Sequence, residues 1–318
     1  MGHDIKKKLD ELASRQPSDA SDGEENSPPE DKEELRRVVK KLRDRSAEKR
    51  RSRPAIRYQR GVPRTEKSPQ PPRASGEPLV LEEAVEGEEL SAPGAGTFYL
   101  IENPLPEIEE EAGKLQAAFD SAFRNADSGL RQRMTDLWPD GGIEPSQTVF
   151  LDLETTGLSC SPLFLIGTMW WEDGELVVRQ YLARDYSEER AVISRFAEKF
   201  AGRQLLVTFN GKSFDMPFLR MRAAGTRVDL PLEPPHFDLL HVCRRVWKDA
   251  LPNCKLQTLE TRICGRPRYG DIPGEQIPAA YHAFVRTGDA GRMVRILHHN
   301  MLDLVTMADL MVRLPPKK

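Results

Sequence analysis

Cysteine is scarce in this 318-residue chain, and its few thiols are not spaced as pairs. Successive cysteines are separated by 82, 10 and 9 residues, and none forms a Cys-x-x-Cys motif; they are Cys160, Cys243, Cys254 and Cys264. This spacing suggests neither a zinc site nor a disulfide framework. We therefore expect free thiols and a reducing compartment, the cytoplasm.

Long apolar runs are also missing from the chain. Residues 1–8 contain no apolar core of a signal peptide. No stretch approaches the roughly 18 uncharged apolar residues that a membrane span needs. We expect a soluble protein with no membrane partner.

Charge is unevenly distributed, although the formal net charge is only −3. Residues 31–73 carry 16 Lys and Arg against 6 Asp and Glu, whereas residues 74–112 carry 11 Glu and no Lys or Arg. Residues 1–95 have too few apolar side chains to offset the cost of ordering the chain. We predict that 1–95 is a disordered, charge-segregated region. It is either a solvated tail or an arm for nucleic acid or a protein partner.

Residues 96–144 are predicted to form an extension made of one strand and two helices. The strand is expected at Thr97–Ile101, where apolar and aromatic residues are followed closely by prolines. Apolar residues at helical spacing follow around Phe119 and Met134. Breakers at Trp138–Gly142 then separate the extension from the main domain.

Residues 145–318 have the pattern of an α/β domain. Three short apolar stretches joined by short connections predict an antiparallel meander, followed by helix, strand and helix. This order predicts a mixed sheet flanked by helices. The expected strands are 149–154, 163–171, 175–183 and 205–209, and the expected helices are 187–200, 214–224, 236–246, 254–260 and one or two within 290–314.

Acidic residues stand beside apolar ones in three separate segments. Asp152 and Glu154 are spaced i, i+2 in a strand and therefore point to the same face. Asp215 lies at the start of a helix that follows a strand, and Asp303 lies on the last long helix. Like charges held a few ångströms apart share a proton or bind a cation, and a hard divalent metal suits oxygen ligands. We predict that the four acids converge on a metal site.

The same segments resemble a known set of motifs. D-x-E-T-T-G at 152–157, N-x-x-x-F-D at 210–215 and H-x-x-x-D at 299–303 are similar to the motifs of the DEDD superfamily of 3′→5′ exonucleases. Within it, residues 251–260, residues 268–274 and the terminal H-N-x-x-D resemble the YprB-type ribonuclease-H-like domain. The resemblance covers about residues 145–314 and implies a ribonuclease-H-like sheet.

The resemblance implies a two-metal mechanism with Mg²⁺ or Mn²⁺. Two ions about 3.5 to 4 Å apart would clamp the attacking water and the leaving oxygen of a phosphodiester. Asp152 would bridge both ions, with Glu154, Asp215 and Asp303 completing their ligands.

A base near the attacking water is also needed. The family carries Tyr four residues, or His five residues, before the last Asp, whereas this chain has His299 at −4 and His298 at −5. Position −4 shares a helix face with Asp303, while −5 is rotated by roughly 140°. We favour His299 as the base, with His298 as the alternative.

Residues expected to bind substrate are small or polar and lie in the same segments: Thr155, Thr156, Gly157, Asn210 and Lys255. The small residues would let a phosphate backbone approach closely. Lys255 or Arg268 could hold a phosphate. Asp238 and Asp271 could supplement the metal site, although Asp271 before Ile-Pro-Gly is more simply a turn residue.

These patterns favour a metal-dependent 3′→5′ exonuclease acting on DNA or RNA, most readily at a single-stranded end. Two alternatives remain open. One is a non-catalytic nucleic-acid-binding or scaffolding module on the same fold, and the other is a structure-specific endonuclease.

Overall fold

The computed structural model describes residues 78–108, 111–135, 143–157, 161–201, 205–230, 234–268 and 270–317. All of them belong to the larger of the chain's two compact units, Leu35–Lys318. The predictions made for residues 1–77 and for Trp138–Gly142 lie outside the described residues.

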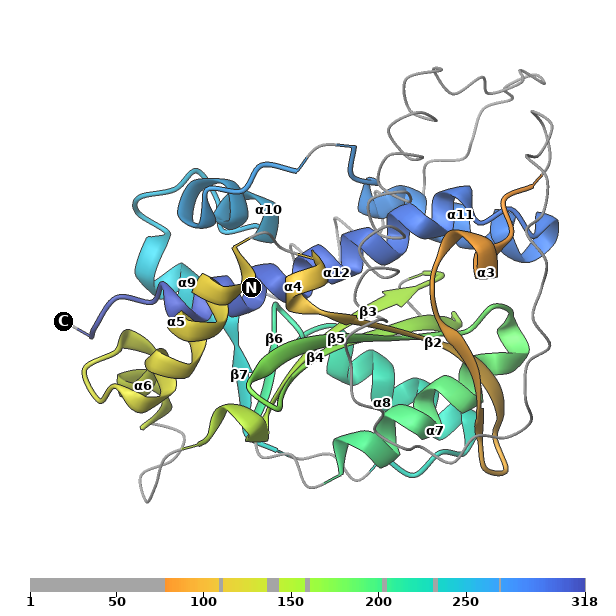
Figure 1. Cartoon of the computed structure of the whole chain (residues 1–318), viewed down its shortest axis with the longest axis horizontal. Coiled ribbons are helices and arrows are strands. Elements are labelled where there is room, and N and C mark those ends of the chain that lie inside the picture. The colour runs from red at the N-terminus through yellow and green to blue at the C-terminus, as the bar shows by residue number, and fades with distance from the viewer. Residues whose placement is uncertain are drawn as a thin grey trace, which may run out of the picture. The chain divides into compact units, whose positions relative to one another are not determined.

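Seven strands of the described residues form one mixed sheet, in the order β1-β2-β5-β4-β3-β6-β7 (Figure 1). Neighbours from β1 to β3 pair antiparallel, and β3, β6 and β7 pair parallel. The predicted meander and mixed sheet are confirmed. The strands are β1 (Glu88–Ala92), β2 (Gly96–Pro104), β3 (Thr148–Thr155), β4 (Leu163–Glu172), β5 (Glu175–Leu182), β6 (Leu205–Thr208) and β7 (His236–Asp238).

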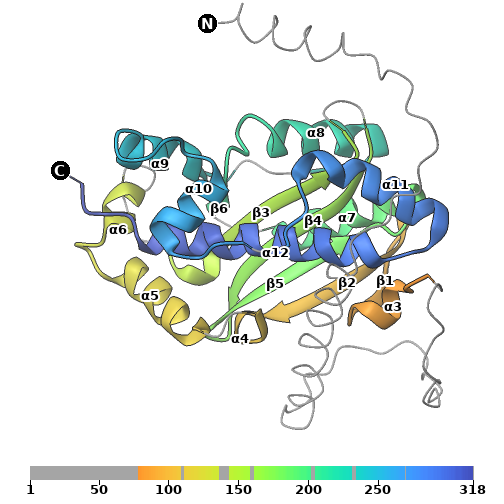
Figure 2. The ribbon, with the colours of Figure 1, turned by 90° about the horizontal axis from the view of Figure 1, so that it is seen from above.

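Helices cover both faces of this sheet. Figure 1 shows α7 and α8 on one face, and Figure 2 shows the long helix α12 crossing the other. None of the described helices is long and apolar enough to span a bilayer. The α-helices are α3 (Leu81–Ala84), α4 (Leu105–Ile108), α5 (Ala112–Arg124), α6 (Gly129–Met134), α7 (Glu189–Phe200), α8 (Asp215–Thr226), α9 (Leu239–Trp247), α10 (Leu256–Leu259), α11 (Ile277–Thr287) and α12 (Gly291–Val312).

Short helical turns complete the described elements. Three are 3₁₀ turns, and the fourth is a π-helical turn that continues α10. They are η1 (Pro145–Gln147), η2 (Tyr186–Glu188), η4 (Gly274–Gln276) and the π-helical η3 (Glu260–Cys264).

The central strand β3 is apolar on both faces because helices cover both. Phe150 belongs to the core cluster that contains Met301 and Leu304 of α12. Val149 and Leu151 belong to the cluster that contains the α7 residues. Since side chains alternate along a strand, Asp152 and Glu154 share the α12 face with Phe150. The turn at Asp173 and Gly174, both at positive φ, joins β4 to β5 as predicted.

Several sequence-based boundaries are wrong. Residues 78–95, expected to be disordered, contain α3 and β1, and β2 of the extension pairs with β5, so the extension is part of the main sheet. Residues 236–238 form strand β7 and not the start of a helix. Helix α8 continues through Gly225 to Thr226, and its C-cap Arg227 takes a left-handed conformation at φ 58°. Helix α7 begins at Glu189 and not at residue 187, because the turn η2, whose N-cap is Asp185, precedes it. Helix α11 was not predicted at all.

Candidate active site

Asp152 and Glu154 lie near the carboxyl end of β3, on the face that α12 covers. Glu154 is buried, and a register shift between Glu154 and Thr155 ends the regular pairing with β4. The strand therefore directs both acids to one face, as the i, i+2 spacing predicted, and α12 covers that face.

Asp215, at the start of α8, lies against the same strand, β3. It is the first residue of α8, and its carboxylate accepts hydrogen bonds from its own backbone N–H and from that of Leu153. β6 pairs with β3 only over Thr148–Phe150, so the backbone of Leu153 lies beyond that ladder. The short β6 thus leaves room for Asp215 beside the two β3 acids.

Helix α12 supplies His299 and Asp303 on one face. His299 Nε2 lies 3.5 Å from Asp303 Oδ2, in agreement with the expected i, i+4 geometry. The other ring nitrogen, Nδ1, lies 2.8 Å and 2.9 Å from the two carboxylate oxygens of Asp271. His299 is therefore held between two acids, and Asp271 is more than the turn residue that we expected.

Arg268 is the second cation of this cluster. Its side chain is only 7% exposed and forms ion pairs with Glu260, Asp271 and Asp303. Glu260 is itself buried and accepts a 2.8 Å hydrogen bond from Thr306 of α12. The guanidinium is thus committed to three carboxylates, and the expected role of Arg268 in holding a phosphate is not what the structure shows.

The three acids nearest β3 all have raised pKa values. Burial, reinforced by the negative charges of Asp303 and Glu154, raises the pKa of Asp152 well above its usual range. Burial also raises the pKa of Glu154 to about 8 and that of Asp215 to about 7. Buried acids that repel one another in this way bind a proton or a cation.

The pKa values of His299 and its partner Asp271 are shifted in opposite directions. Burial lowers the pKa of His299, but the hydrogen bond with Asp271 and the charges of Asp303 and Glu154 outweigh it and raise the pKa to about 9. Burial would raise the pKa of Asp271, but His299 and Arg268 outweigh it and lower the pKa. The pair is therefore an imidazolium and a carboxylate at neutral pH. His298, by contrast, has a pKa lowered by burial.

The residues expected to bind substrate lie in two loops and one exposed position. Thr155 donates to the carbonyl of Gly157 at 2.9 Å, and Thr156 donates to that of Pro162 at 3.1 Å, so this turn is tied together locally. Asn210 adopts φ 67° in the turn before α8. Lys255 is exposed at the N-terminus of α10. Their role toward a substrate stays a prediction.

Asp238 is a structural residue and not a supplement to the metal site. Its buried carboxylate accepts the backbone N–H groups of Asn210 at 2.8 Å, Lys212 at 3.0 Å and Leu240 at 3.1 Å. It therefore caps α9 and holds the turn that presents Asp215.

The donor set suits a hard divalent cation because it is rich in carboxylate oxygen. Within the described residues, no group of three or more His, Cys, Asp or Glu side chains is arranged to hold a metal ion. Two of the donors are engaged by protein groups, since Asp303 pairs with Arg268 and Asp152 accepts a hydrogen bond from Asn300. The chemistry of the donors, four carboxylates, fits a hard divalent metal.

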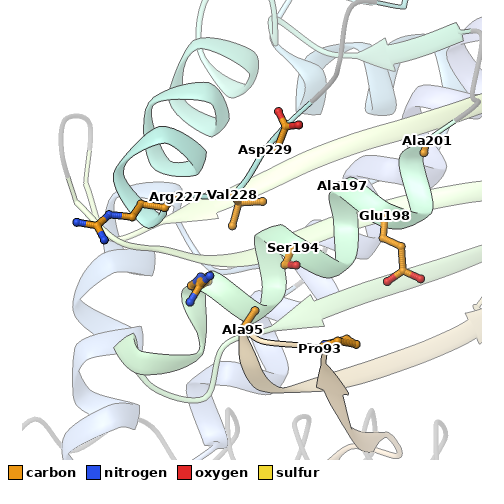
Figure 3. A pocket seen from close by; sticks show the side chains of 10 residues that line it. Pro93, Ala95, Ser194, Ala197, Glu198, Ala201, Arg227, Val228 and Asp229 are labelled. Atoms are coloured by element: carbon orange, nitrogen blue, oxygen red, sulfur yellow. The ribbon is translucent and has the colours of Figure 1, made fainter.

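A cavity of about 380 Å³ lies elsewhere, on the α7 side of the sheet (Figure 3). Pro93 and Ala95 of the β1–β2 hairpin, Ser194 and Glu198 of α7, and Arg227 and Val228 after α8 contribute to its lining. None of the four predicted ligand acids lines it.

Comparison with known proteins places the fold in a family. A family model described as the RNase_H superfamily matches residues 149–315, which include β3 from its second residue, α8 and α12. The chain belongs to the ribonuclease H superfamily. It is 33% identical over 181 residues to the uncharacterized protein YprB of Bacillus subtilis (strain 168), covering 55% of this chain and 44% of YprB. The predicted ribonuclease-H-like domain of the YprB type is thereby confirmed.

Two polymerases also share similarity with this ribonuclease-H-like chain. A DNA polymerase of Pyrococcus glycovorans is 28% identical over 164 residues, covering 42% of this chain and 21% of the polymerase. The structure of the family B DNA polymerase from Pyrobaculum calidifontis matches at 17% identity and a TM-score of 0.42, covering 54% of this chain and 25% of that one. The chain thus spans less than half the length of these relatives.

Sequence reasoning missed several residues that the cluster uses. Arg268 and Asp271 were named, but as a possible phosphate contact and as a turn residue or supplementary ligand, and not as partners of Asp303 and His299. Asn300 stood in the H-N-x-x-D motif without an assigned role. Glu260 and Gln180 carried a weaker signal, since each is a polar residue among apolar neighbours of a helix or strand.

Proposed function

We propose that this chain is a metal-dependent nuclease that hydrolyses phosphodiester bonds in DNA or RNA, as a 3′→5′ exonuclease of the DEDD type. The observation that supports it is that β3, α8 and α12 bring four acids to one region, where burial and, after it, the charges of neighbouring acids raise the pKa values of three of them. Acids so placed bind a cation in preference to three protons when Mg²⁺ or Mn²⁺ is present. Membership of the ribonuclease H superfamily supports the same reading.

Each residue then has a defined task. Bound divalent ions supply an activated water and stabilise the charge that develops on the phosphoryl group. Asp152, Glu154, Asp215 and Asp303 would hold the ions. His299 would take the proton of the attacking water at Nε2, which faces Asp303, while Asp271 holds Nδ1 and orients the ring.

His299 must lose its own proton before it can act as a base. The hydrogen bond with Asp271 is the largest cause that raises its pKa, and the charges of Asp303 and Glu154 add to it. Cations bound to Asp303 and Glu154 would offset that second part. This step links metal binding to the availability of the base. We keep His299 as the proposed base and His298 as the alternative.

The test uses single-stranded DNA and RNA, each labelled at the 5′ end, with Mg²⁺ or Mn²⁺ and the full chain. We expect a ladder of products that shorten stepwise from the 3′ end, and no products from Asp152→Asn. Glu198→Gln, which removes an exposed acid of α7 that pairs with Arg195, should match the wild type. A 3′-blocked or circular substrate that is cut would instead show an endonuclease.

A second candidate function has one observation in its favour. Arg268 neutralises Asp303 within the cluster, as a built-in cation would in a module that binds nucleic acid without cutting it. Tight binding of every substrate without turnover, in Mg²⁺ and in Mn²⁺, would support that module and reject the nuclease.

A further inference from the structure

Three neighbouring strands place Asp152, Gly167 and Gln180 in one row across the sheet. Asp152 of β3 is paired with Gly167 of β4, and Gly167 is paired with Gln180 of β5. The row passes under α12, whose Asn300 lies directly over Gly167. A carboxylate of the candidate site and a buried amide thus flank a glycine that has no side chain.

Asn300 spans this row and connects its two ends. Its side-chain Nδ2 donates to Asp152 Oδ2 at 2.8 Å and to the Asp152 backbone carbonyl at 3.3 Å. Its Oδ1 accepts a 2.8 Å hydrogen bond from Gln180 Nε2. Asn300 is fully buried, so each of these bonds replaces water that cannot reach the amide.

Gln180 determines which way the Asn300 amide faces. Gln180 Nε2 also donates to the backbone carbonyl of Leu297 at 2.7 Å. A carbonyl can only accept, so the nitrogen of Gln180 must be on that side, and both of its hydrogens are used. Asn300 must therefore turn its oxygen to Gln180 and its nitrogen to Asp152.

Gly167 is required because Asn300 occupies the space of a side chain. A Cβ at position 167 would lie 2.1 Å from Asn300 Oδ1 and 2.5 Å from Nδ2, well inside any allowed contact. Even alanine would push the amide off the row. Glycine is therefore needed here for close approach, and not for an unusual backbone angle.

We propose that Asn300 is a positioning residue that holds the Asp152 carboxylate for metal binding, with Gln180 orienting its amide and Gly167 making room for it. This inference rests on the proposed function, in which Asp152 is a metal ligand. Hydrogen bonds of this kind to ligating carboxylates orient them, and their loss typically weakens metal binding about 10- to 100-fold. Asn300 holds only Oδ2, and Oδ1 of Asp152 accepts no hydrogen bond from the part of the chain that the structure describes.

The test measures the dissociation constant of Mn²⁺ for the full chain by calorimetry. Asn300→Leu, which keeps the volume but removes both hydrogen-bonding atoms, should weaken Mn²⁺ binding about 10- to 100-fold. Gln180→Leu should weaken it less in the wild-type background. It should have no further effect in the Asn300→Leu background, because it acts through Asn300, whereas independent structural losses would add.

Two further variants keep the test decisive. Gly167→Ala displaces Asn300 without removing a polar group and should weaken Mn²⁺ binding even if Asn300→Leu does not fold. Tyr281→Phe is the matched control, because it removes a buried 2.9 Å hydrogen bond to Ala183 of comparable kind and should leave the Mn²⁺ affinity unchanged. Circular dichroism confirms that each variant is folded.

The outcomes separate the two proposals. If the wild type binds Mn²⁺ and the folded Asn300→Leu and Gly167→Ala variants bind it equally well, the positioning role is overturned and the proposed nuclease stands. Additive effects of Gln180→Leu and Asn300→Leu would also overturn it. If the wild type binds no Mn²⁺, the proposed function is overturned, and the positioning role with it.

Discussion

At the residue scale, the acids near β3 make the stability of the metal-free protein depend on pH. The pKa values of Glu154 and Asp215 are raised by burial to about 8 and about 7, above the roughly 4 of an unfolded chain. The folded state therefore binds more protons than the unfolded state between pH 4 and 8. Their contribution to stability is fully present below pH 4 and is lost as the pH rises to 8.

Replacing Asp152 should reduce the loss of stability that occurs as the pH rises to 8. Asp152→Asn removes one of the charges that repel each other, so in the presence of a chelator we expect its free energy of unfolding at pH 8 to exceed that of the wild type by roughly 1 to 3 kcal/mol. Urea unfolding at pH 5 and pH 8 measures this. Equal pH dependence in the two proteins would contradict the assigned repulsion, and Glu198→Gln is the control for a surface acid.

The two adjacent histidines should differ sharply in their effect on hydrolysis. His299 contacts Asp271 and Asp303, so His299→Gln should lower kcat by about 10²- to 10⁴-fold, the range for loss of a general base. For His298→Gln we expect less than about a 10-fold change, because His298 lies off that helix face. Single-turnover rates with saturating Mn²⁺ decide this, and the opposite ranking would make His298 the base.

The motif acids were predictable from the sequence because their spacing determines which side chains share a face of a strand or helix. Two carboxylates at i, i+2 in a strand share a face wherever the strand lies, and His299 and Asp303 at i, i+4 share a helix face. The partners that decide their charge were not predictable. Arg268 and Asp271 meet α12 only through a Pro- and Gly-rich segment whose path no periodicity describes.

At the scale of elements, the turn from β6 into α8 determines where Asp215 lies. The turn contains Asn210 at φ 67° and Gly211, where a Cβ would meet Thr208 Oγ1 at 2.4 Å. Asp238, at the end of β7, accepts two of its backbone N–H groups. A conformation this restricted depends on its buried acceptor.

Removing that acceptor should destabilise the protein and the site together. Asp238→Ala removes the acceptor of the part-buried N–H groups of Asn210 and Lys212 and of the buried N–H of Leu240, at a cost of about 2 to 4 kcal/mol. Asp185→Ala, which removes an exposed cap before α7, should cost only about 1 kcal/mol. Denaturant unfolding compares the two variants, and a similar loss in both would show that the turn does not depend on Asp238.

The sequence did not show β7 because a three-residue strand is too short to display a period of two. Its one apolar residue, Phe237, is separated from the apolar residues of α9 by Asp238 alone, and the whole stretch has helical spacing. Pairing with β6 overrides that local pattern. Long elements such as α12 and the meander, by contrast, repeat their pattern often enough to be recognised.

At the scale of the whole molecule, the sheet extends farther toward the N-terminus than composition suggested. Glu-rich residues 82–89 have the composition of a disordered chain, yet β1 pairs with β2 along its full length. Leu81, Ala92 and Phe98 are buried, and they belong to the same core cluster as α7. A few apolar residues at buried positions thus order a segment whose average composition is acidic. We propose that residues 78–318 are one folded part of the chain, which includes the ribonuclease-H-like domain.

The basic block at residues 31–73 can then be tested separately from residues 78–318. Lys and Arg that neutralise phosphates make binding weaken with salt, by roughly 0.7 in the slope of log K against log salt for each phosphate contact with a single strand. We expect deletion of residues 1–77 to leave the unfolding temperature within about 3 °C of the full chain's. The salt slope for single-stranded DNA binding should fall by about 2 or more.

A full-length variant separates charge from length. Arg36→Gln, Arg37→Gln, Lys40→Gln and Lys41→Gln together remove four positive charges without shortening the chain. If the block acts through its charge, this variant should reproduce much of the loss of slope that the deletion causes. Fluorescence anisotropy between 50 and 300 mM salt, in a chelator so that no strand is cut, gives the slopes. Unchanged slopes in both variants would mean that residues 31–73 make no contact with nucleic acid, and the region would then be a solvated tail or a contact for protein.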